Sequence, residues 1–431
     1  MKLLIKNGTV IDPSQHIDKK MDVLMENGKI CKLGKNIREN GCEIFNAKDM
    51  IVSPGLIDMH AHLREPGRED AETIATGTAS AAKGGFTSVC CMPNTEPAID
   101  NQSVVKFVLE KAEKNSNINV FVIGAITKGR EGKELAEIAD MNDAGIVAVS
   151  DDGNWVENSA LMRRALEYSE TFNILVISHC EDKTLSGKGV MNESHTSTVL
   201  GLEGIPMKAE EIAVFRDISL AKMLNARIHI AHVSSGGTVA LIKEAKSRNI
   251  KVSCEVTPNH FTLTEEAIRD YDTNTKVNPP LRSGDDIKAI KKGLADGTID
   301  VIATDHAPHT ITEKEYEYDN APFGIIGFET AIGLAITELV HSKVLSLSQL
   351  IEKLSYNPAK ILGFETKGTL KIGSDADITI IDENKEWIVD VNRFLSKSKN
   401  CPYHNRKLKG KVIATIVNGK IVFCNSIRES K

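Results

Sequence analysis

Two histidines end the first long apolar run of this chain. His60 and His62 close the stretch that begins at Ile51, within the sequence PGLIDMHAHLREPG. Residues two apart in a β-strand project from the same face, so both imidazoles would leave the strand end in one direction. Imidazole is a common ligand of zinc and related cations. The pair therefore predicts a metal site, and the simpler explanation is that two polar residues close a strand.

Further apolar runs of the chain end in the same way. Each has an ordinary explanation alone, because a buried histidine is often only hydrogen-bonded and an aspartate often caps a helix. Together they place four histidines and two or three aspartates at five strand ends. His229 and His260 lie near the same ends and are predicted to be ordinary buried histidines. The residues that follow the runs are Asp151, Asp152, His179, His232 and Asp305, with His306 and His309 close behind.

Six such ligands favour two metal ions over one. A catalytic zinc takes about three protein ligands and keeps one position open, whereas two metals about 3.5–4 Å apart share a larger set. A metal pair lowers the pKa of bound water towards about 7 and polarises a carbonyl oxygen. The constellation therefore predicts metal-assisted attack of water on an amide-like carbonyl.

Eight strand-like runs carry these residues, and amphipathic stretches separate most of them. The alternation predicts an α/β fold of parallel βα units, and closure into a (β/α)8 TIM barrel is the simplest arrangement. Catalytic residues of such barrels gather at the carboxyl ends of the strands. The alternative is an open doubly wound sheet, which would normally carry a glycine-rich turn after its first strand. The predicted strands are 51–58, 86–92, 119–126, 146–151, 174–180, 227–233, 251–257 and 301–305, and the clearest helices are 101–115, 158–170, 208–224 and 236–248.

The two ends of the chain differ from its middle. Residues 1–50 and 366–431 hold short apolar runs separated by Asn-Gly pairs, which is a strong hairpin signal. Neither end has enough strands to bury two faces alone. We therefore expect both ends to form one small β-sandwich domain that flanks a barrel of residues 51–365. Segment 384–410 is predicted to be a solvated connection, with a basic patch as the alternative.

Composition excludes several classes of protein. The net charge is −6 and the pI is about 6.1, whereas nucleic-acid binding would need a basic face. The sequence has no uncharged apolar stretch of about 18 residues, so we expect no membrane span. The apolar run at the N-terminus is too short for a signal peptide. None of the eight cysteines forms a CxxC pair, and reduced cysteines in apolar runs fit a cytoplasmic location.

Sequence motifs along nearly the whole chain resemble the amidohydrolase superfamily and, within it, the dihydroorotase family of the stand-alone bacterial and archaeal type. The motifs are PGLIDMHAHLREPG, CMPNT, SDDG, SHCED, AHVSS, EVTPNH, VNPPLR, ATDHAPH and APFGIIGFET. The resemblance implies reversible cyclisation of N-carbamoyl-L-aspartate to L-dihydroorotate and water. This reaction is the third step of de novo pyrimidine (UMP) biosynthesis.

The resemblance also implies two Zn2+ ions per subunit. His60, His62 and Asp305 would bind one ion, His179 and His232 would bind the other, and Asp152 would bridge them. Many relatives use a carbamylated lysine as the bridge, and this chain matches the subgroup in which a carboxylate replaces it. From the residues alone Asp151 stays a rival, because adjacent side chains point apart.

The family further implies a set of substrate contacts and one catalytic carboxylate. Asp305 would transfer the proton, and a guanidinium such as that of Arg64 suits a substrate carboxylate. The alternative for Arg64 is a surface ion pair with Glu65 or Glu69. Segment 310–321 is either a lid or an exposed loop. The residues expected to contact substrate are His62, Arg64, Asn94, Asn278, His309, Phe323 and Gly324.

Two other functions compete with this expectation. The first is an allantoinase or hydantoinase on the same scaffold, against which Arg64 and the absent bridging lysine both argue. The second is a catalytically inactive scaffold for aspartate transcarbamoylase, in which some ligands would be lost, whereas all six are present. For the active enzyme we expect a small-molecule substrate and no nucleic acid or membrane partner. A homodimer and an association with aspartate transcarbamoylase are both compatible with the resemblance.

Overall fold

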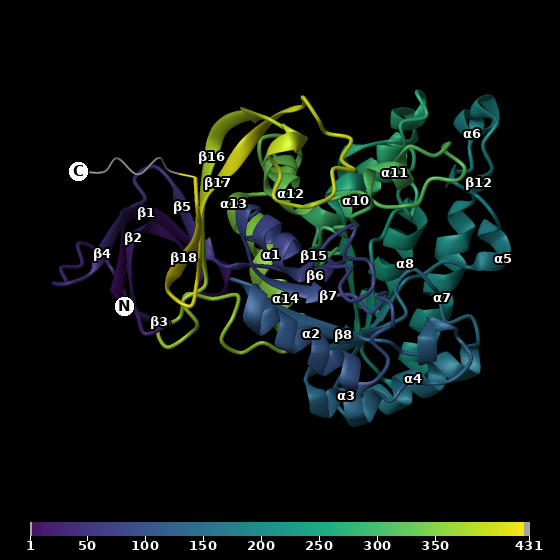
Figure 1. Ribbon diagram of the computed structural model, residues 1–431, viewed down its shortest axis with the longest axis horizontal. Coiled ribbons are helices and arrows are strands. Elements are labelled where there is room, and N and C mark those ends of the chain that lie inside the picture. Colours follow the sequence, from purple (N-terminus) through teal and green to yellow (C-terminus); the bar gives the residue numbers. More distant parts are fainter. Residues whose placement is uncertain (1, 426–431) are drawn as a thin grey trace.

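Eight parallel strands form a barrel at the centre of the computed structural model, which describes residues 2–425 (Figure 1). They neighbour one another in chain order, and a parallel bridge between Ala61 and His306 joins the last strand end to the first. The predicted (β/α)8 barrel is therefore confirmed. The strands are β6 (Leu56–Ala61), β7 (Phe86–Cys91), β8 (Asn119–Gly124), β9 (Ile146–Ser150), β10 (Leu175–Ser178), β13 (Ile228–Ile230), β14 (Val252–Val256) and β15 (Val301–Ile302).

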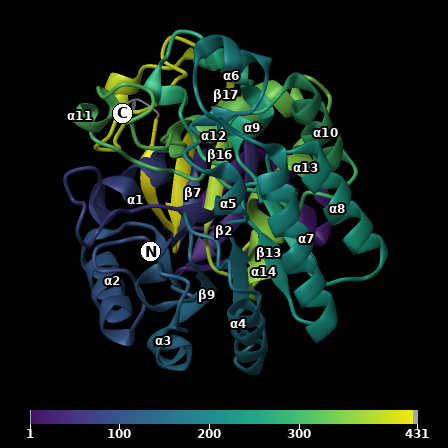
Figure 2. The same cartoon turned by 90° about the vertical axis from the view of Figure 1, so that its right-hand side faces the viewer.

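Helices follow the strands and surround the barrel (Figure 2). Side-chain caps begin several of them. Asn101, for example, accepts hydrogen bonds from the backbone N–H groups of Ser103 and Val104 at the start of α2. The outer helices are α1 (Ile74–Lys83), α2 (Gln102–Asn115), α3 (Ile138–Ala144), α4 (Ser159–Thr171), α7 (Met207–Leu224), α8 (Gly236–Ser247), α10 (Gly284–Ala295) and α12 (Phe328–Ala335).

Shorter elements complete the barrel domain. They lie in the loops after the strands and in the chain that leads back to the flanking sheet. The loops carry α5 (Lys183–Ser186), β11 (Met191–Asn192), α6 (His195–Leu200), β12 (Gly204–Ile205), α9 (Pro258–Thr262) and α11 (Ile311–Lys314), and the returning chain carries α13 (Leu347–Ile351) and α14 (Asn357–Leu362).

The strand residues divide between two apolar cores. One core lies between strands and helices and includes Leu56, Val89, Val149 and Ile228. The other core fills the barrel interior. Because side chains alternate along a strand, most barrel strands supply apolar residues to both cores. The interior residues are Met59, Cys90, Met92, Ile123, Ala148, Leu175, Ile177, Ala231, Val301 and Ala303.

Strands from both chain ends form one eight-stranded sheet beside the barrel (Figure 1). Asn27-Gly28 and Asn418-Gly419 turn the hairpins of this sheet with positive φ angles, as predicted. The limits 1–50 and 366–431 stay a prediction, and residues 426–431 lie outside the described residues. The strands are β1 (Lys2–Asp12), β2 (Ile17–Glu26), β3 (Lys29–Gly34), β4 (Glu43–Asn46), β5 (Ile51–Pro54), β16 (Ile378–Ile388), β17 (Lys407–Val417) and β18 (Lys420–Cys424).

The predicted strand 51–58 is in fact two strands that belong to different sheets. β5 pairs with β1 and β16 in the flanking sheet, and β6 pairs with β7 in the barrel. The chain crosses between them at Gly55, whose N–H donates to the Asp377 carbonyl at 2.8 Å. A continuous apolar run predicts burial, but it does not reveal which sheet buries it.

The connection between β16 and β17 is also not the solvated segment that the sequence predicted. Residues 389–406, which we call the strap, extend from the flanking sheet over the barrel (Figure 1). Phe394, Cys401 and Tyr403 pack with Ile326 and Leu334 of the barrel in a small apolar core. The strap is polar in sequence because its buried serines and asparagine hydrogen-bond to backbone and carboxylate groups.

Among residues 2–425, no helix is both long enough and apolar enough to cross a membrane.

We predict that Gly55→Ala destabilises the protein. A Cβ atom at this position would overlap the side chain of Thr87, so the crossover between the two sheets would have to shift. Overpacking of this kind costs about 1–3 kcal/mol of unfolding free energy. Urea denaturation of the unaltered protein and of the Gly55→Ala variant measures this loss of unfolding free energy. Gly284→Ala is the matched control, because a Cβ there meets nothing within 4 Å. Equal stability of the Gly55→Ala variant and the unaltered protein would contradict the prediction.

Candidate metal centre and active site

Strand ends bring six metal-ligand side chains together at one rim of the barrel. Each of them is at most 7% exposed. Two groups of three place their ligand atoms within 4.8 Å of one another: His60, Asp152 and His232, and His60, His62 and Asp305. His179 belongs to neither group, but its Nδ1 lies 2.8 Å from His232 Nε2. Residues nearly 250 positions apart in the chain therefore form a single cluster.

Asp152 lies at the middle of this cluster. Its Oδ1 is 3.1 Å from His60 Nε2, 3.8 Å from His179 Nδ1 and 4.0 Å from His232 Nε2. Its Oδ2 is 3.6 Å from His62 Nε2. One carboxylate thus approaches all four imidazoles, which is the arrangement that a bridging ligand requires.

The neighbouring Asp151 is turned away from the histidines. Its Oδ1 accepts hydrogen bonds from the N–H groups of Ile126 and Thr127, at 2.8 and 2.9 Å. The side chain therefore binds the loop after β8. The sequence left the two aspartates as rivals, and the backbone direction after β9 turns only Asp152 toward the imidazoles.

The charged side chains of the cluster strongly shift one another's pKa values. Burial opposes a charge on Asp152, yet the nearby His60, His62 and His179 hold its pKa well below the usual range. Burial likewise opposes a charge on His60, but the carboxylates around it raise its pKa well above the ordinary value. His232 differs, because burial and two neighbouring imidazoles lower its pKa to about 3. A neutral imidazole beside ionised carboxylates is a suitable ligand set for a cation.

The side chains of the cluster fit a metal ion by a second criterion as well. His60 Nε2 and His232 Nδ1 are buried and make no well-aligned hydrogen bond with the described residues. A buried polar atom without a partner is costly, and a ligand that uses its lone pair removes that cost. Imidazole and carboxylate together suit zinc and other divalent transition metals.

A buried carboxylate that the sequence analysis missed orients His60. Glu255 on β14 places Oε1 2.6 Å from His60 Nδ1 and Oε2 3.3 Å from His229 Nε2. His229 Nδ1 in turn lies 2.8 Å from the hydroxyl of Ser253. Outer carboxylates of this kind fix the tautomer and the ring orientation of a metal ligand. The sequence offered one signal of this role. Glu255 lies within the predicted strand 251–257, and a buried glutamate rarely lacks a partner.

Six of the seven residues predicted to contact substrate line a cavity of about 410 Å³ beside the cluster, and His309 is not among its lining residues. Arg64 is half-buried there and does not form the alternative surface ion pair with Glu65 or Glu69. Its Nε donates to the Pro308 carbonyl at 3.0 Å, and Nη2 lies 3.3 Å from His309 Nε2. Burial and the nearby Arg68 lower the pKa of Arg64 to about 10. The guanidinium is therefore a half-buried cation close to the candidate metal ligands.

Two asparagines connect this cavity to other side chains. Asn94 Oδ1 lies 2.8 Å from His62 Nδ1, and its Nδ2 donates to Asp152 at 3.2 Å. Asn278 donates to Glu181 at 2.8 Å. Glu181, which the sequence analysis also missed, lies 3.4 Å from His179 Nε2.

The strap braces the far wall of the cavity. Asn400 Nδ2 donates to the carbonyls of Ala307 and Gly324, at 2.9 and 3.0 Å, and its Oδ1 accepts from the N–H of His309. His309 Nε2 lies 2.8 Å from the Phe323 carbonyl. The strap thus holds the two parts of the connection between β15 and α12 that carry His309, Phe323 and Gly324. No motif in the sequence of the strap indicated this role.

Segment 310–321 closes another side of the cavity. Two buried lysines hold it, since Lys276 donates to the carbonyls of Tyr318 and Asp319 and Lys314 donates to those of Thr273 and Pro322. Tyr316 in the same segment is 54% exposed. Whether the segment moves as a lid stays a prediction.

Two remaining histidines near the rim have partners outside the cluster. His306 Nε2 lies 3.4 Å from Glu72, and its ring stacks on Phe328. His260 Nε2 lies 2.8 Å from the Pro279 carbonyl. Both are buried in hydrogen-bonded positions away from the six candidate ligands.

Comparison with known proteins shows that the chain is similar to dihydroorotases over nearly its whole length. Residues 51–422 match the family described as "Amidohydrolase family". The chain is 57% identical over 422 residues to a dihydroorotase of Pelotomaculum thermopropionicum, covering 98% of each protein. It is 54% identical to a dihydroorotase of Acetivibrio thermocellus, covering 97% of this chain and 98% of that one. Among solved structures, the L-hydantoinase (dihydropyrimidinase) of Arthrobacter aurescens is similar, with a TM-score of 0.88, 25% identity and coverage of 97% and 95%.

We predict that Glu255→Gln weakens metal binding. The variant keeps the size of the side chain but loses the charge that orients His60, and loss of such a partner lowers metal affinity about 10–100-fold. Competition with a chromophoric chelator measures the affinity directly, and circular dichroism verifies the fold. Ser253→Ala is the control, because it removes only the outermost hydrogen bond of the chain Ser253–His229–Glu255. Unchanged affinity in Glu255→Gln would refute the orienting role.

Proposed function

The chain belongs to the amidohydrolase family, and on this premise we propose that it is a dihydroorotase, which interconverts N-carbamoyl-L-aspartate and L-dihydroorotate plus water. Identity of 57% to a dihydroorotase over nearly the full length of both proteins carries this conclusion. The structure adds a half-buried cation, Arg64, in the same cavity as the candidate metal ligands. A substrate that has both a carboxylate and a cyclic amide suits that combination.

Two Zn2+ ions per subunit are the proposed cofactor. His60, His62 and Asp305 would hold one ion, His179 and His232 would hold the other, and Asp152 would bridge them, which its central position supports. When bound, zinc supplies a water of lowered pKa and polarises a carbonyl oxygen. The side chains hold these ligand positions through neighbours such as Glu255 and Asn94.

The remaining cavity residues orient the substrate. Arg64 would receive its carboxylate, because a guanidinium forms two parallel hydrogen bonds with a carboxylate, and Asn94 and His309 lie beside it. Asn278 and the backbone of Phe323 and Gly324 would contact the ring, and His62, which lines the same cavity, is a further proposed substrate contact. The strap and Lys276 hold the loops that carry these contacts, so that little ordering is needed when substrate binds.

Asp305 is the proposed proton carrier. In hydrolysis, water oxygen bonds to the ring carbonyl carbon, and the carbon–nitrogen bond of the ring breaks. Asp305 accepts the proton that the attacking water loses and donates it to the departing ring nitrogen. Cyclisation follows the same path in reverse. His60, His62 and His232 favour the ionised carboxylate and lower the pKa of Asp305 despite its burial, so that it begins as a base.

A hydantoinase or allantoinase on the same scaffold is the alternative. The likeness to the Arthrobacter aurescens enzyme is one of fold at 25% identity, and Arg64 would have no carboxylate to bind in hydantoin. An inactive scaffold is disfavoured because all six candidate ligands converge. The homodimer, the association with aspartate transcarbamoylase and the cytoplasmic location stay predictions.

A substrate panel tests the proposed function. We expect turnover of L-dihydroorotate, with turnover of hydantoin and allantoin at least about a hundredfold slower, because only the first carries a carboxylate for Arg64. Elemental analysis of the same preparation should give two zinc ions per chain. Arg64→Met should raise KM for L-dihydroorotate about tenfold or more and leave the zinc content unchanged. Faster turnover of hydantoin or allantoin than of L-dihydroorotate would overturn the assignment.

Asp305→Asn should abolish turnover without emptying the metal centre. The amide cannot accept the proton, and loss of a general base costs about 10²–10⁴-fold in kcat. Steady-state rates in both directions measure the loss, and zinc analysis establishes that the other five candidate ligands still hold metal. Asp151→Asn is the matched control, because that carboxylate binds the β8 loop instead of the cluster. A rate near that of the unaltered enzyme would remove Asp305 from its role.

A further inference from the structure

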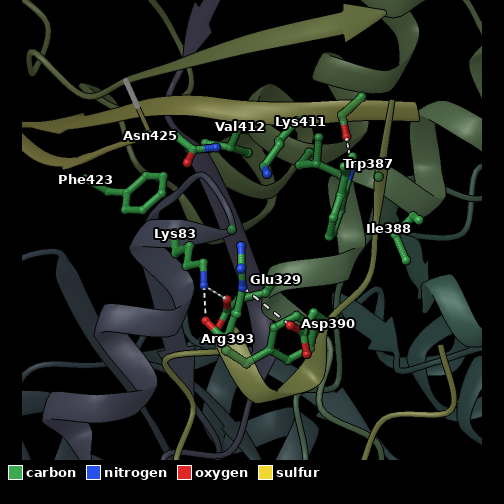
Figure 3. Close-up of a pocket in the computed structure, with 15 residues that line it drawn as sticks. Lys83, Glu329, Trp387, Ile388, Asp390, Arg393, Lys411, Val412, Phe423 and Asn425 are labelled. Carbon is green, nitrogen blue, oxygen red and sulfur yellow. Dashed lines mark hydrogen bonds and ion pairs between the residues drawn. The ribbon is translucent and has the colours of Figure 1, made fainter. Parts of the chain in front are cut away.

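A second cavity lies between the flanking sheet and the outer helices of the barrel. Its volume is about 210 Å³, and it shares no lining residue with the substrate cavity. Its walls come from the end of α1, from α12, from β16 to β18 and from the strap. We call it the flanking cavity; Figure 3 labels ten of its lining residues.

Aromatic and apolar side chains form two sides of the flanking cavity. Figure 3 places Phe423 on one side and Trp387 on the other, with Val412 between them. Trp387 is fixed, because its Nε1 donates to the Gly410 carbonyl at 2.9 Å. A Cβ at Gly333 would lie 3.0 Å from its ring, so only glycine lets the indole lie this close to α12. Half-buried, rigid rings of this kind favour a planar aromatic guest.

Three cations line the same space. Figure 3 shows the ends of Arg393 and Lys411 turned toward the same space, with the end of Lys83 beside Glu329 and Arg393. Lys83 pairs with Glu329 at 2.8 Å, and Arg393 lies 3.4 Å from Asp390. No carboxylate lies within ion-pair distance of Lys411 anywhere in residues 2–425. Its ammonium instead lies 5.3 Å from the centre of the Trp387 ring.

The position of Lys411 is electrostatically unfavourable without an anion. Burial lowers its pKa, and the like charges of Lys83, Lys385 and Arg393 lower it further. An anion placed among these cations would remove that repulsion and gain charge-assisted hydrogen bonds. Glu329 and Asp390 offset the charges of Lys83 and Arg393, which leaves Lys411 as the cation without a carboxylate partner among residues 2–425. A phosphate could bind Lys411 and Arg393 together, because it offers several oxygens and up to two charges.

We propose that the flanking cavity binds a small aromatic phosphate, with its ring between Trp387 and Phe423 and its phosphate on Lys411 and Arg393. The site is separate from the proposed catalytic centre. Its ligand would also contact the strap, since Arg393 and Phe394 line the cavity and Asn400 of the same segment braces Gly324 in the substrate cavity.

Isothermal titration calorimetry of the full-length, metal-loaded protein tests the proposal with phenyl phosphate as the probe. Phenol carries only the ring, and inorganic phosphate carries only the charge. Each should therefore bind at least about tenfold more weakly than phenyl phosphate. Lys411→Met should weaken the binding of phenyl phosphate by a similar factor and leave the binding of phenol unchanged. Lys409→Met is the matched control, because this lysine is on the same strand but does not line the cavity. Lys411 is outside the catalytic machinery, so turnover of L-dihydroorotate should stay unchanged.

Fluorescence gives an independent readout, because the chain has two tryptophans and only Trp387 lines the cavity. Phenyl phosphate should quench part of the emission, and Trp387→Leu should remove that change. Phosphate bound at the metal centre would be insensitive to Lys411→Met and to Trp387→Leu, so equal affinity in all three proteins overturns the proposal. Absence of binding at millimolar probe also overturns it. Benzoate that binds as tightly as phenyl phosphate would overturn the assignment of a phosphate.

Discussion

The buried carboxylate of Asp58 joins the first and the last strand of the barrel, and the geometry of the rim depends on it. Its oxygens accept hydrogen bonds from the backbone N–H and the hydroxyl of Thr304, at 3.1 and 2.5 Å, and from the N–H of His60 at 3.0 Å. Burial raises the pKa of Asp58 to about 7. One side chain therefore fixes the register in which His60 and Asp305 lie opposite each other, on strands that are far apart in sequence.

That register creates an electrostatic arrangement that needs a cation. Asp152, Asp305 and Glu255 lie within one small volume around His60, and all are nearly inaccessible to water. Buried charges of this kind are stable only when they are paired or coordinate a metal. Imidazolium groups can supply the pairing, and a metal ion can replace their protons. The charges that hold the side chains of the rim in place are therefore the same charges that would attract a cation.

The flanking sheet supports the rim from a distance through the strap. The sheet gives the strap two fixed ends, at β16 and β17, and the strap buries Tyr403 against the barrel. Its Asn400 then holds the backbone of Ala307 and Gly324, which lie on either side of α11 in the connection between β15 and α12. Loops that carry binding residues are often the least stable part of a barrel, and here a segment from outside the barrel braces them. The flanking cavity lies at the other end of the same segment.

The sequence predicts the barrel, the strand ends that carry chemistry and the candidate ligands, because strand periodicity and local motifs are properties of neighbouring residues. It could not separate Asp151 from Asp152, assign Ile51–Pro54 to the flanking sheet or recognise the strap, since each depends on which distant segment lies alongside. Glu255 and Asn400 are further cases, because their hydrogen-bond partners are about 195 and 93 positions away. These points become visible in the folded chain, because the role of a buried polar group depends on the atoms that form hydrogen bonds with it.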